Sequence, residues 1–529
     1  MKLALSLKRA GLVAIAMAAV GCAMAQVSSG VVLKSHIGLA TFGAGSGNDC
    51  WGYVSPSGRE YAIMGMNNQV AYIEVTDPSN PVVIKTIPHS SSTWGDIKVY
   101  NGFAYSVTET AGTGIQVVDM TDIDNGNVTL VQTLTNPSRA HNVALDTVNG
   151  YLYTCGTRGG TGTTMCFDLS DPANPVQVGP DSMTTNYHHD GQLVNYTTGP
   201  MAGKQIWYGF SEGRGVDVYD FTNKEAPIMI KRIVYPNMNY CHQGWISEDG
   251  QYLYVDDELD ESGLSVNTRS LVFNVADPLN AFYVGTFSTN LPAIDHNQYT
   301  DDGFIFQANY RSGLRIFDTM PNPESPVQAG FYDTYPNNDN RGFDGAWSTY
   351  PYFPSGNVVI SDINTGFYLV DPSEAVTRTK APEAFTTTIG TLSSGDLSSL
   401  LAADGNVARF IPGGLPPAEG YVGGFETWTP AFDSHPDRIQ ISVVSRVMSG
   451  GFQQSLEVYN WESSDWVQMN VSGLSASFGT AVGVVSENTE DYVQPGTNLI
   501  RVRVRWTPFT RTGPRLQALV DQVKFEIKR

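Results

Sequence analysis

The sequence predicts an all-β protein, namely a seven-bladed β-propeller followed by a C-terminal antiparallel β-sandwich. Three observations lead to this fold class. A short strand-like run recurs seven times along the first part of the chain. The composition favours turns and strands, with 53 Gly, 29 Pro and 26 Tyr among 529 residues and only 16% charged residues. Beyond the last repeat, several segments alternate polar and apolar residues, which is typical of strands with one buried face.

The seven repeated runs are rich in β-branched and aromatic residues, and a Pro usually follows each of them. The residues that end these runs are Glu74, Asp119, Asp168, Asp220, Asn274, Asp318 and Asp371. Their spacings are 45, 49, 52, 54, 44 and 53 residues. A period of this length, with about four short strands in each unit, is typical of a β-propeller.

One strand of the seventh blade is predicted to come from the N-terminus. The segments "VVIKTI" at 82–87 and "IMIKRI" at 228–233 have the pattern of fourth strands, and nothing after Asp371 resembles them. The segment "VVLKSHI" at 31–37 does resemble them. We therefore expect it to complete the last blade and to close the ring, which removes exposed sheet edges.

The repeat stops near residue 375, and the pattern then changes. We predict the propeller over 26–375, a linker over 376–388 and a β-sandwich accessory domain over 389–529. Residues 381–529 hold 15 acidic and 11 basic side chains, and they show no catalytic constellation. The alternating segments predict strands at 438–447, 454–461, 498–506 and 522–528.

Residues 1–25 have the pattern of a secretory signal peptide. Lys2, Lys8 and Arg9 precede a short apolar run, and "AMA" at 23–25 is typical of a cleavage site. The alternative is a lipid anchor at Cys22, because "AVGC" resembles a bacterial lipobox. No later apolar run is long enough to span a bilayer. We expect a secreted, extracellular or cell-surface protein, with the periplasm as an alternative location.

The net charge limits the kinds of binding partner, and the number of cysteines limits the role of disulfides in the fold. The formal net charge of −21 makes nucleic acid and anionic lipid poor partners. Four cysteines follow the signal peptide, which is too few for a disulfide scaffold. Cys155 and Cys166 flank a Gly-rich hairpin loop. Two alternatives remain open for them, namely a disulfide bond and a pair of free thiols.

Titratable residues stand at one place in all seven repeats, at the start of the predicted first strand. The aligned residues are Asp49 or Cys50, Asp96, His141, His189, His242, His296 and Asp344. First strands line the channel of a propeller, so we predict a ring of these side chains. Imidazole and carboxylate groups suit Zn, Cu, Mn or Fe, and they also suit acid–base catalysis. The alternative is a structural ring that hydrogen-bonds neighbouring blades.

Carboxylates form a second candidate group. Glu109, Glu212 and Glu258 align at the ends of second strands, and Glu109 and Glu258 are the candidate catalytic bases. The segment "DDELDE" at 256–261 adds an acidic cluster made of Asp256, Asp257, Glu258, Asp260 and Glu261. Oxygen-rich clusters favour Ca²⁺, while a solvated acidic loop is the alternative interpretation.

Four stretches resemble the choice-of-anchor B proteins, whose blades carry LVIVD-type repeats. They lie at 94–119, 240–261, 293–318 and 345–372, within a similarity over about residues 45–372. The positions that match the family pattern are Asp96, Glu109, His141, His189, Asp190, His242, Asp256, Asp257, Glu258 and His296. In the first unit the pattern favours Asp49 over Cys50. The resemblance implies an exported bacterial β-propeller, and the end "KFEIKR" suggests that the family's anchor is missing or replaced by the sandwich.

Two function hypotheses follow from these residues. The first is an extracellular or cell-surface binding and scaffold protein that uses the propeller face for a protein or a glycan. The second is an oxidase-like or hydrolase-like metal-dependent enzyme. In it, two or three of the aligned histidines hold the metal, and Glu109 or Glu258 acts as the base. Ca, Zn, Cu, Mn and Fe all remain open as the divalent metal.

Overall fold

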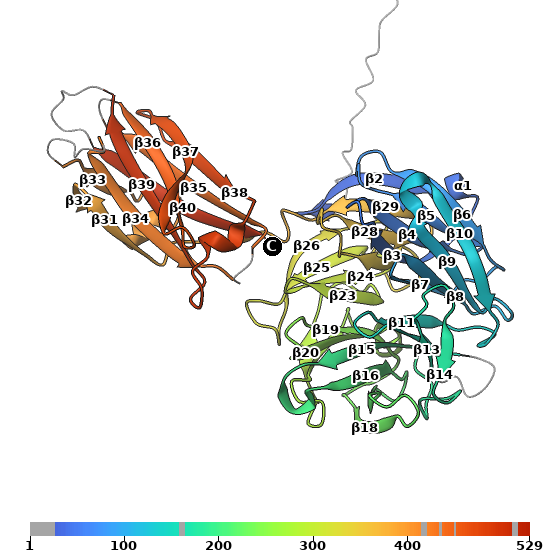
Figure 1. The fold of residues 1–529 in the computed structure, drawn as a ribbon. Helices are drawn as coiled ribbons and strands as arrows, with labels where there is room; N and C mark the ends of the chain where they lie inside the picture. The colour runs from blue at the N-terminus through green and yellow to red at the C-terminus, as the bar shows by residue number, and fades with distance from the viewer. Residues whose placement is uncertain are drawn as a thin grey trace, which may run out of the picture.

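The computed structural model describes residues 27–157, 164–413, 420–432, 436–448, 451–509 and 517–528, and the fold is all-β (Figure 1). The predicted signal peptide and Cys22 lie outside these residues. The short helices of the described chain are α1 (Leu39–Phe42), α2 (Asp260–Leu264) and the 3-10 turns η1 (Ile123–Asn125), η2 (Gly199–Met201), η3 (Leu397–Leu400) and η4 (Thr489–Tyr492). None of the helices described is both long and apolar enough to cross a membrane.

Seven antiparallel sheets fill the first part of the chain. The first four comprise β3 (Gly47–Val54), β4 (Glu60–Met66), β5 (Gln69–Glu74) and β6 (Val82–Pro88); β7 (Gly95–Tyr100), β8 (Phe103–Thr108), β9 (Ile115–Asp122) and β10 (Asn127–Leu134); β11 (Asn142–Asp146), β12 (Tyr151–Cys155), β13 (Met165–Asp168) and β14 (Val176–Val178); and β15 (Asp190–Tyr196), β16 (Lys204–Phe210), β17 (Val216–Asp220) and β18 (Ile228–Ile233).

The other three sheets continue the same order. They comprise β19 (Cys241–Ile246), β20 (Tyr252–Asp257), β21 (Ser270–Asn274) and β22 (Phe282–Phe287); β23 (Asn297–Asp301), β24 (Phe304–Ala308), β25 (Leu314–Asp318) and β26 (Val327–Tyr332), with β1 (Ser28–Ser29) beyond it; and β27 (Ala346–Tyr350), β28 (Val358–Asp362), β29 (Gly366–Asp371) and β2 (Val32–Gly38). The first strands of successive sheets contact one another, and β27 contacts β3 again, so the sheets form a closed, propeller-like ring.

The N-terminal strand lies where the sequence suggested. β2 pairs antiparallel with β29 and supplies the fourth strand of the last sheet. This sheet thus combines the start of the chain with residues more than three hundred positions later, and β2 covers the edge that β29 would otherwise expose.

The repeated acidic residues close the turn between the third and fourth strands. Their side-chain oxygens accept the backbone N–H two residues further on, which stabilises a tight turn. This bond is present at Asp119, Asp168, Asp220, Asn274, Asp318 and Asp371. Glu74 instead binds the guanidinium of Arg59. The repeat in the sequence therefore marks turn chemistry rather than the functional site.

The hydrophobic core of the ring lies between neighbouring sheets. The fourth and fifth sheets, for example, bury Tyr208 and Val218 against Leu253 and Phe273. Inner strands are covered on both faces, and every residue of β4 is buried. The apolar runs therefore alternate little along the sequence, as expected for strands between two packed layers.

The last part of the chain forms two further antiparallel sheets. One comprises β32 (Thr391–Ser394), β33 (Ala408–Ile411), β40 (Ala518–Lys528), β35 (Arg438–Val447) and β38 (Gly479–Val485), and β30 (Arg378–Lys380) also pairs with β40; the other comprises β31 (Ala384–Ile389), β34 (Gly423–Pro430), β39 (Leu499–Pro508), β36 (Phe452–Asn460) and β37 (Asp465–Leu474). Phe410, Phe425 and Trp506 stack in the core. The predicted linker at 376–388 is wrong, because most of it forms β30 and β31 of these sheets.

Candidate functional site

Four histidines lie side by side on the wall of a cavity of about 730 Å³. His141, His189 and His296 each precede the first residue of an inner strand, and His242 is the second residue of β19. Consecutive ring centroids are 4.0, 4.1 and 4.4 Å apart. All four side chains are buried from bulk solvent. Because they line the cavity, they present a row of imidazoles to any molecule that enters it.

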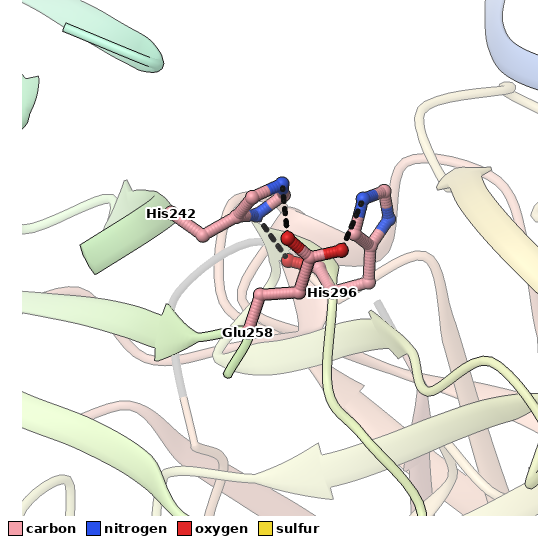
Figure 2. Close-up of side chains that lie close together, drawn as sticks. All are labelled: His242, Glu258 and His296. Atoms are coloured by element: carbon pink, nitrogen blue, oxygen red, sulfur yellow. Dashed lines mark hydrogen bonds and ion pairs between the residues drawn. The ribbon is translucent and has the colours of Figure 1, made fainter. Parts of the chain in front are cut away.

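Two of these histidines share a glutamate. The Glu258 carboxylate lies between the imidazoles of His242 and His296, as Figure 2 shows. Its two oxygens lie 3.9 Å from Nε2 of His242 and 3.8 Å from Nε2 of His296. Within the described part of the chain, these three residues are the one group whose ligand atoms all lie within 4.8 Å of one another. The spacing is that of side chains around one metal ion.

The other ring nitrogens of both histidines are held by the protein. Nδ1 of His242 lies 2.8 Å from Asp256 and 3.2 Å from the carbonyl oxygen of His296. Nδ1 of His296 donates to the carbonyl oxygen of Trp347 at 2.6 Å. A carbonyl only accepts hydrogen bonds, so Nδ1 carries the proton in both rings and the Nε2 lone pair points toward Glu258. Metal-binding histidines are commonly oriented in this way.

Burial favours the neutral form of three of these imidazoles, those of His189, His242 and His296. It lowers the pKa of His242 to about 3, together with the nearby His141, and it lowers the pKa of His296 to about 3, together with His242. The pKa of His189 is lowered well below its ordinary value by the same burial and by His141. Because a neutral imidazole is the form that binds a metal, protons compete little for these rings at neutral pH.

Further carboxylates and phenols line the same cavity. Glu109 lies 2.8 Å from Nδ1 of His141, and the Tyr240 hydroxyl donates to Glu212 at 3.1 Å. The Tyr310 hydroxyl donates to Glu258 at 2.7 Å. Glu212 and Tyr310 both have positive φ, at 49° and 35°, which is unfavourable for residues with a side chain. Backbone strain of this kind clusters at functional sites.

Asp49 and Asp96 do not join the histidines. Asp96 lies on β7 and binds Nζ of the buried Lys98 at 2.6 Å, while Asp49 lies 3.8 Å from the same nitrogen. Burial and the neighbouring Asp96 raise the pKa of Asp49. Burial also opposes ionisation of Asp96, but Lys98 and the hydrogen bonds from Asp49 and the backbone of Val143 together outweigh it, so the pKa of Asp96 is lowered. These residues form a separate polar cluster among the inner strands.

Asp344 lies outside the row of histidines as well. It binds the guanidinium of Arg311 in a partly exposed ion pair. In this sheet, the place beside the cavity that a histidine fills in other sheets is filled by Trp347. In the second sheet it is filled by Trp94. A β-bulge places Trp347 between two paired residues of β27, as another bulge places His242 in β19. The predicted seven-membered ring of titratable groups is therefore wrong, and aromatic residues complete the wall.

The acidic segment at 256–261 is not one cluster. Asp256 supports His242 and Glu258 faces the cavity, whereas Asp257 accepts bonds from the Tyr235 hydroxyl and the backbone of Asn239. The other two residues, Asp260 and Glu261, are buried beside Arg269. The side chains point to different partners, so the predicted Ca²⁺ cluster is wrong and the segment is not a solvated loop.

The cysteine pair is also resolved by strand register. Cys166 on β13 lies opposite Tyr153 of β12, so Cys155 does not face it across the strands. Cys50, Cys155, Cys166 and Cys241 are all buried free thiols. A disulfide between Cys155 and Cys166 is therefore absent from the structure.

Sequence reasoning missed the aromatic members of the cavity. Tyr187, Tyr240, Tyr310, Trp94 and Trp347 line it beside the histidines. One signal was available for two of them, because Tyr187 and Tyr240 each stand two residues before a histidine. The support of His242 by Asp256 was not visible, because it depends on pairing between strands.

No family model matches the sequence, and no curated protein matches it. Similar solved structures include "COPII on membranes, outer coat vertex", with a TM-score of 0.44 and 9% identity over 61% of this chain and 84% of that chain. Another, "The structure of the COPII coat assembled on membranes", has the same score, identity and coverage of this chain, which spans 46% of that one.

Proposed function

We propose that this protein is an exported seven-bladed β-propeller with a C-terminal β-sandwich, and that it is a metal-dependent enzyme, hydrolase-like with zinc or manganese and oxidase-like with iron. The observation that carries the proposal is the group of His242, Glu258 and His296 at the wall of a large cavity. Export rests on the signal-peptide pattern at residues 1–25. Membership of the choice-of-anchor B proteins rests on the repeats in the sequence alone.

The donor set indicates which metals fit. Two imidazoles and one carboxylate suit Zn²⁺, and they also suit Mn²⁺ and Fe²⁺. Ca²⁺ prefers six to eight oxygen ligands, which this group does not offer. Three protein ligands also leave a position for water or substrate, which distinguishes catalytic zinc sites from closed structural ones.

The cavity supplies groups for acid–base chemistry beside the metal ligands. A bound metal ion would supply an activated water and would polarise the bond to be cleaved. Glu109, held by His141, and Glu212, held by Tyr240, are carboxylates on the same wall that can accept or donate a proton. Glu258 acts as a ligand in this proposal, so Glu109 and Glu212 remain as the candidate bases.

Elemental analysis of the purified full-length protein tests the metal site. We expect close to one Zn, Mn or Fe per chain, lost in a His242→Ala/His296→Ala double variant that keeps its circular dichroism spectrum. The control is His36→Ala. His36 is exposed, it does not line the cavity, and its ring binds the carbonyl oxygen of Thr365. Calcium alone, or no metal after reconstitution with each ion, would contradict the proposal. Iron as the native metal would move the reaction class from hydrolysis to oxidation.

A further inference from the structure

A second cavity lies among the inner strands and shares none of its lining residues with the histidine cavity. Its volume is about 290 Å³, close to the lower end of the range for small-molecule sites. The residues that define it are Trp51, Lys98, Asp190, Gln192, Trp245 and Tyr299. They come from five inner strands, and they stand further along those strands than the histidines do.

Three aromatic rings form one side of this second cavity. Tyr299 lies between Trp51 and Trp245, with ring centroids at 5.5 and 5.0 Å and edge-to-face angles of 74° and 68°. Both tryptophans are only partly buried, whereas Tyr299 is buried behind them. The ammonium group of Lys98 and the ring of Tyr350 already contact Trp51, so Trp245 is the ring on which a ligand can stack. Large, rigid rings provide apolar contact area at little entropic cost.

The remaining lining residues provide both donors and acceptors. Oε1 of Gln192 accepts the backbone N–H of Ile246 at 2.9 Å, which leaves the amide NH₂ for a ligand. One oxygen of Asp190 accepts the N–H of Gly191 at 2.7 Å, which leaves the second oxygen. Lys98 lies at the edge of the cavity, with Nζ 4.4 Å from the centre of the Trp51 ring.

The charges of the second cavity disfavour strongly charged ligands. Lys98 is its cation, and the salt bridge to Asp96 at 2.6 Å already neutralises it. An anionic ligand would therefore find no free positive charge and would face Asp190. An organic cation would meet the ammonium group that already covers the Trp51 ring. The best fit is a neutral ligand with an apolar face and several hydroxyl groups.

We propose that this second cavity binds one sugar ring of a glycan. The C–H face of the ring would lie on Trp245, and its hydroxyls would bind Asp190 and the amide of Gln192. The volume admits a single ring, so the rest of the glycan would extend out of the cavity. This role is independent of the metal site, and it gives the exported protein a way to attach to a carbohydrate.

Saturation-transfer NMR on the full-length protein tests the proposal, with glucose, galactose, mannose and N-acetylglucosamine as probes. We expect at least one sugar to bind the wild type saturably and Trp245→Ala to weaken it about tenfold. Gln192→Glu keeps the acceptor for Ile246 but removes the NH₂ donor, and we expect a loss of similar size. Trp466→Ala, in the last two sheets, is the matched control and should bind as the wild type does.

Two results would overturn the sugar proposal. One is the absence of saturable binding for all four sugars, and the other is equal affinity in the wild type and in both cavity variants. If Trp245→Ala fails to fold, Gln192→Glu decides, because this partly exposed residue keeps its backbone contact. The His242→Ala/His296→Ala variant should still bind the sugar, so failure of the metal site and failure of the sugar site are distinguishable.

Discussion

Two buried carboxylate sites, one in the ring of seven sheets and one in the last two sheets, are arranged differently. In the last two sheets, Glu457 is only 3% exposed and its two oxygens bind Arg503 at 2.7 Å and Arg505 at 2.6 Å. In the ring, Glu258 faces two neutral imidazoles, and the buried Asp256 and Asp295 each have an oxygen without a partner among the described residues. Removal of one partner from a buried ion pair destabilises a fold, whereas buried titratable groups without partners are candidates for a functional site.

The largest expected effect comes from breaking the paired arrangement. Glu457→Ala should lower the free energy of unfolding of the last two sheets by about 3 kcal/mol, because it leaves Arg503 and Arg505 without their counter-charge. Guanidinium chloride unfolding, followed by tryptophan fluorescence, measures this change. The metal content should stay at the wild-type level, and Glu457→Gln should have a smaller effect. A change below about 0.5 kcal/mol would mean that the three charges contribute little.

The next effect concerns the support of a metal ligand. Asp256→Asn should weaken metal binding about tenfold to a hundredfold, because Asp256 orients His242 without touching the metal. Competition with a chelator, followed by elemental analysis, measures the dissociation constant. The control is Asp257→Asn, since Asp257 is its neighbour on β20 and binds Tyr235 instead. Equal affinities in the two variants would argue against an orienting role for Asp256.

The fold was predictable because it follows from local, repeated patterns. In six of the seven sheets, an Asp or Asn at the end of the third strand binds the turn that follows it, so the recurrence of these residues every 44 to 54 positions reveals each sheet. The strand at 31–37 was recognisable because its pattern matched those of other fourth strands. Histidines at equivalent places in neighbouring repeats also had to lie near one another, which placed His189 beside His242.

The details of the site were less predictable because they depend on register and on contacts between repeats. A bulge in β19 inserts His242, and a similar bulge in β27 puts Trp347 where Asp344 was expected. Insertion of one residue leaves no clear mark in a sequence alignment of repeats. Asp344 pairs with Arg311 from the preceding unit, and no local pattern announces this contact.

The third prediction uses the unpaired arrangement directly. Burial and the nearby Asp96 raise the pKa of Asp190 to about 7. The folded state therefore holds this proton more tightly than the unfolded state, and stability falls as the pH rises from about 4 to 7. Asp190→Asn removes the titrating group. It should stabilise the protein at pH 8, on the order of 1–2 kcal/mol because the cavity admits water, and change little at pH 4.

Denaturant unfolding of the metal-free protein at both pH values measures this difference. Asp465→Asn, at an exposed site in the last two sheets, is the control for the loss of one carboxylate. Destabilisation by Asp190→Asn at pH 8 would show that the ionised carboxylate is well stabilised in the fold. It would then belong with the paired charges of the last two sheets rather than with the unpaired groups of the ring.

The smallest expected effect concerns the junction between the two regions. Arg378 on β30 belongs to the last two sheets by strand pairing, but its guanidinium binds Asp318 at 3.0 Å and lies 3.9 Å from the Phe304 ring centre. Arg378→Ala should weaken the interaction between the ring of seven sheets and the last two sheets by about 1 kcal/mol. This is the magnitude expected for a single ion pair with a stacked ring. Calorimetry measures this change. In the variant, the melting transitions of the two regions should lie further apart in temperature than they do in the wild type.

Arg378→Lys sharpens this last test, because it keeps the charge and loses the planar fork. The guanidinium also donates to the carbonyl oxygens of Asp302 and Gly303, at 3.1 and 3.0 Å, which one ammonium group cannot reproduce in the same geometry. If Lys restores the wild-type transitions, charge alone joins the regions. If it behaves as Ala does, the directed bonds join them, and the paired charges of the protein act through geometry as much as through attraction.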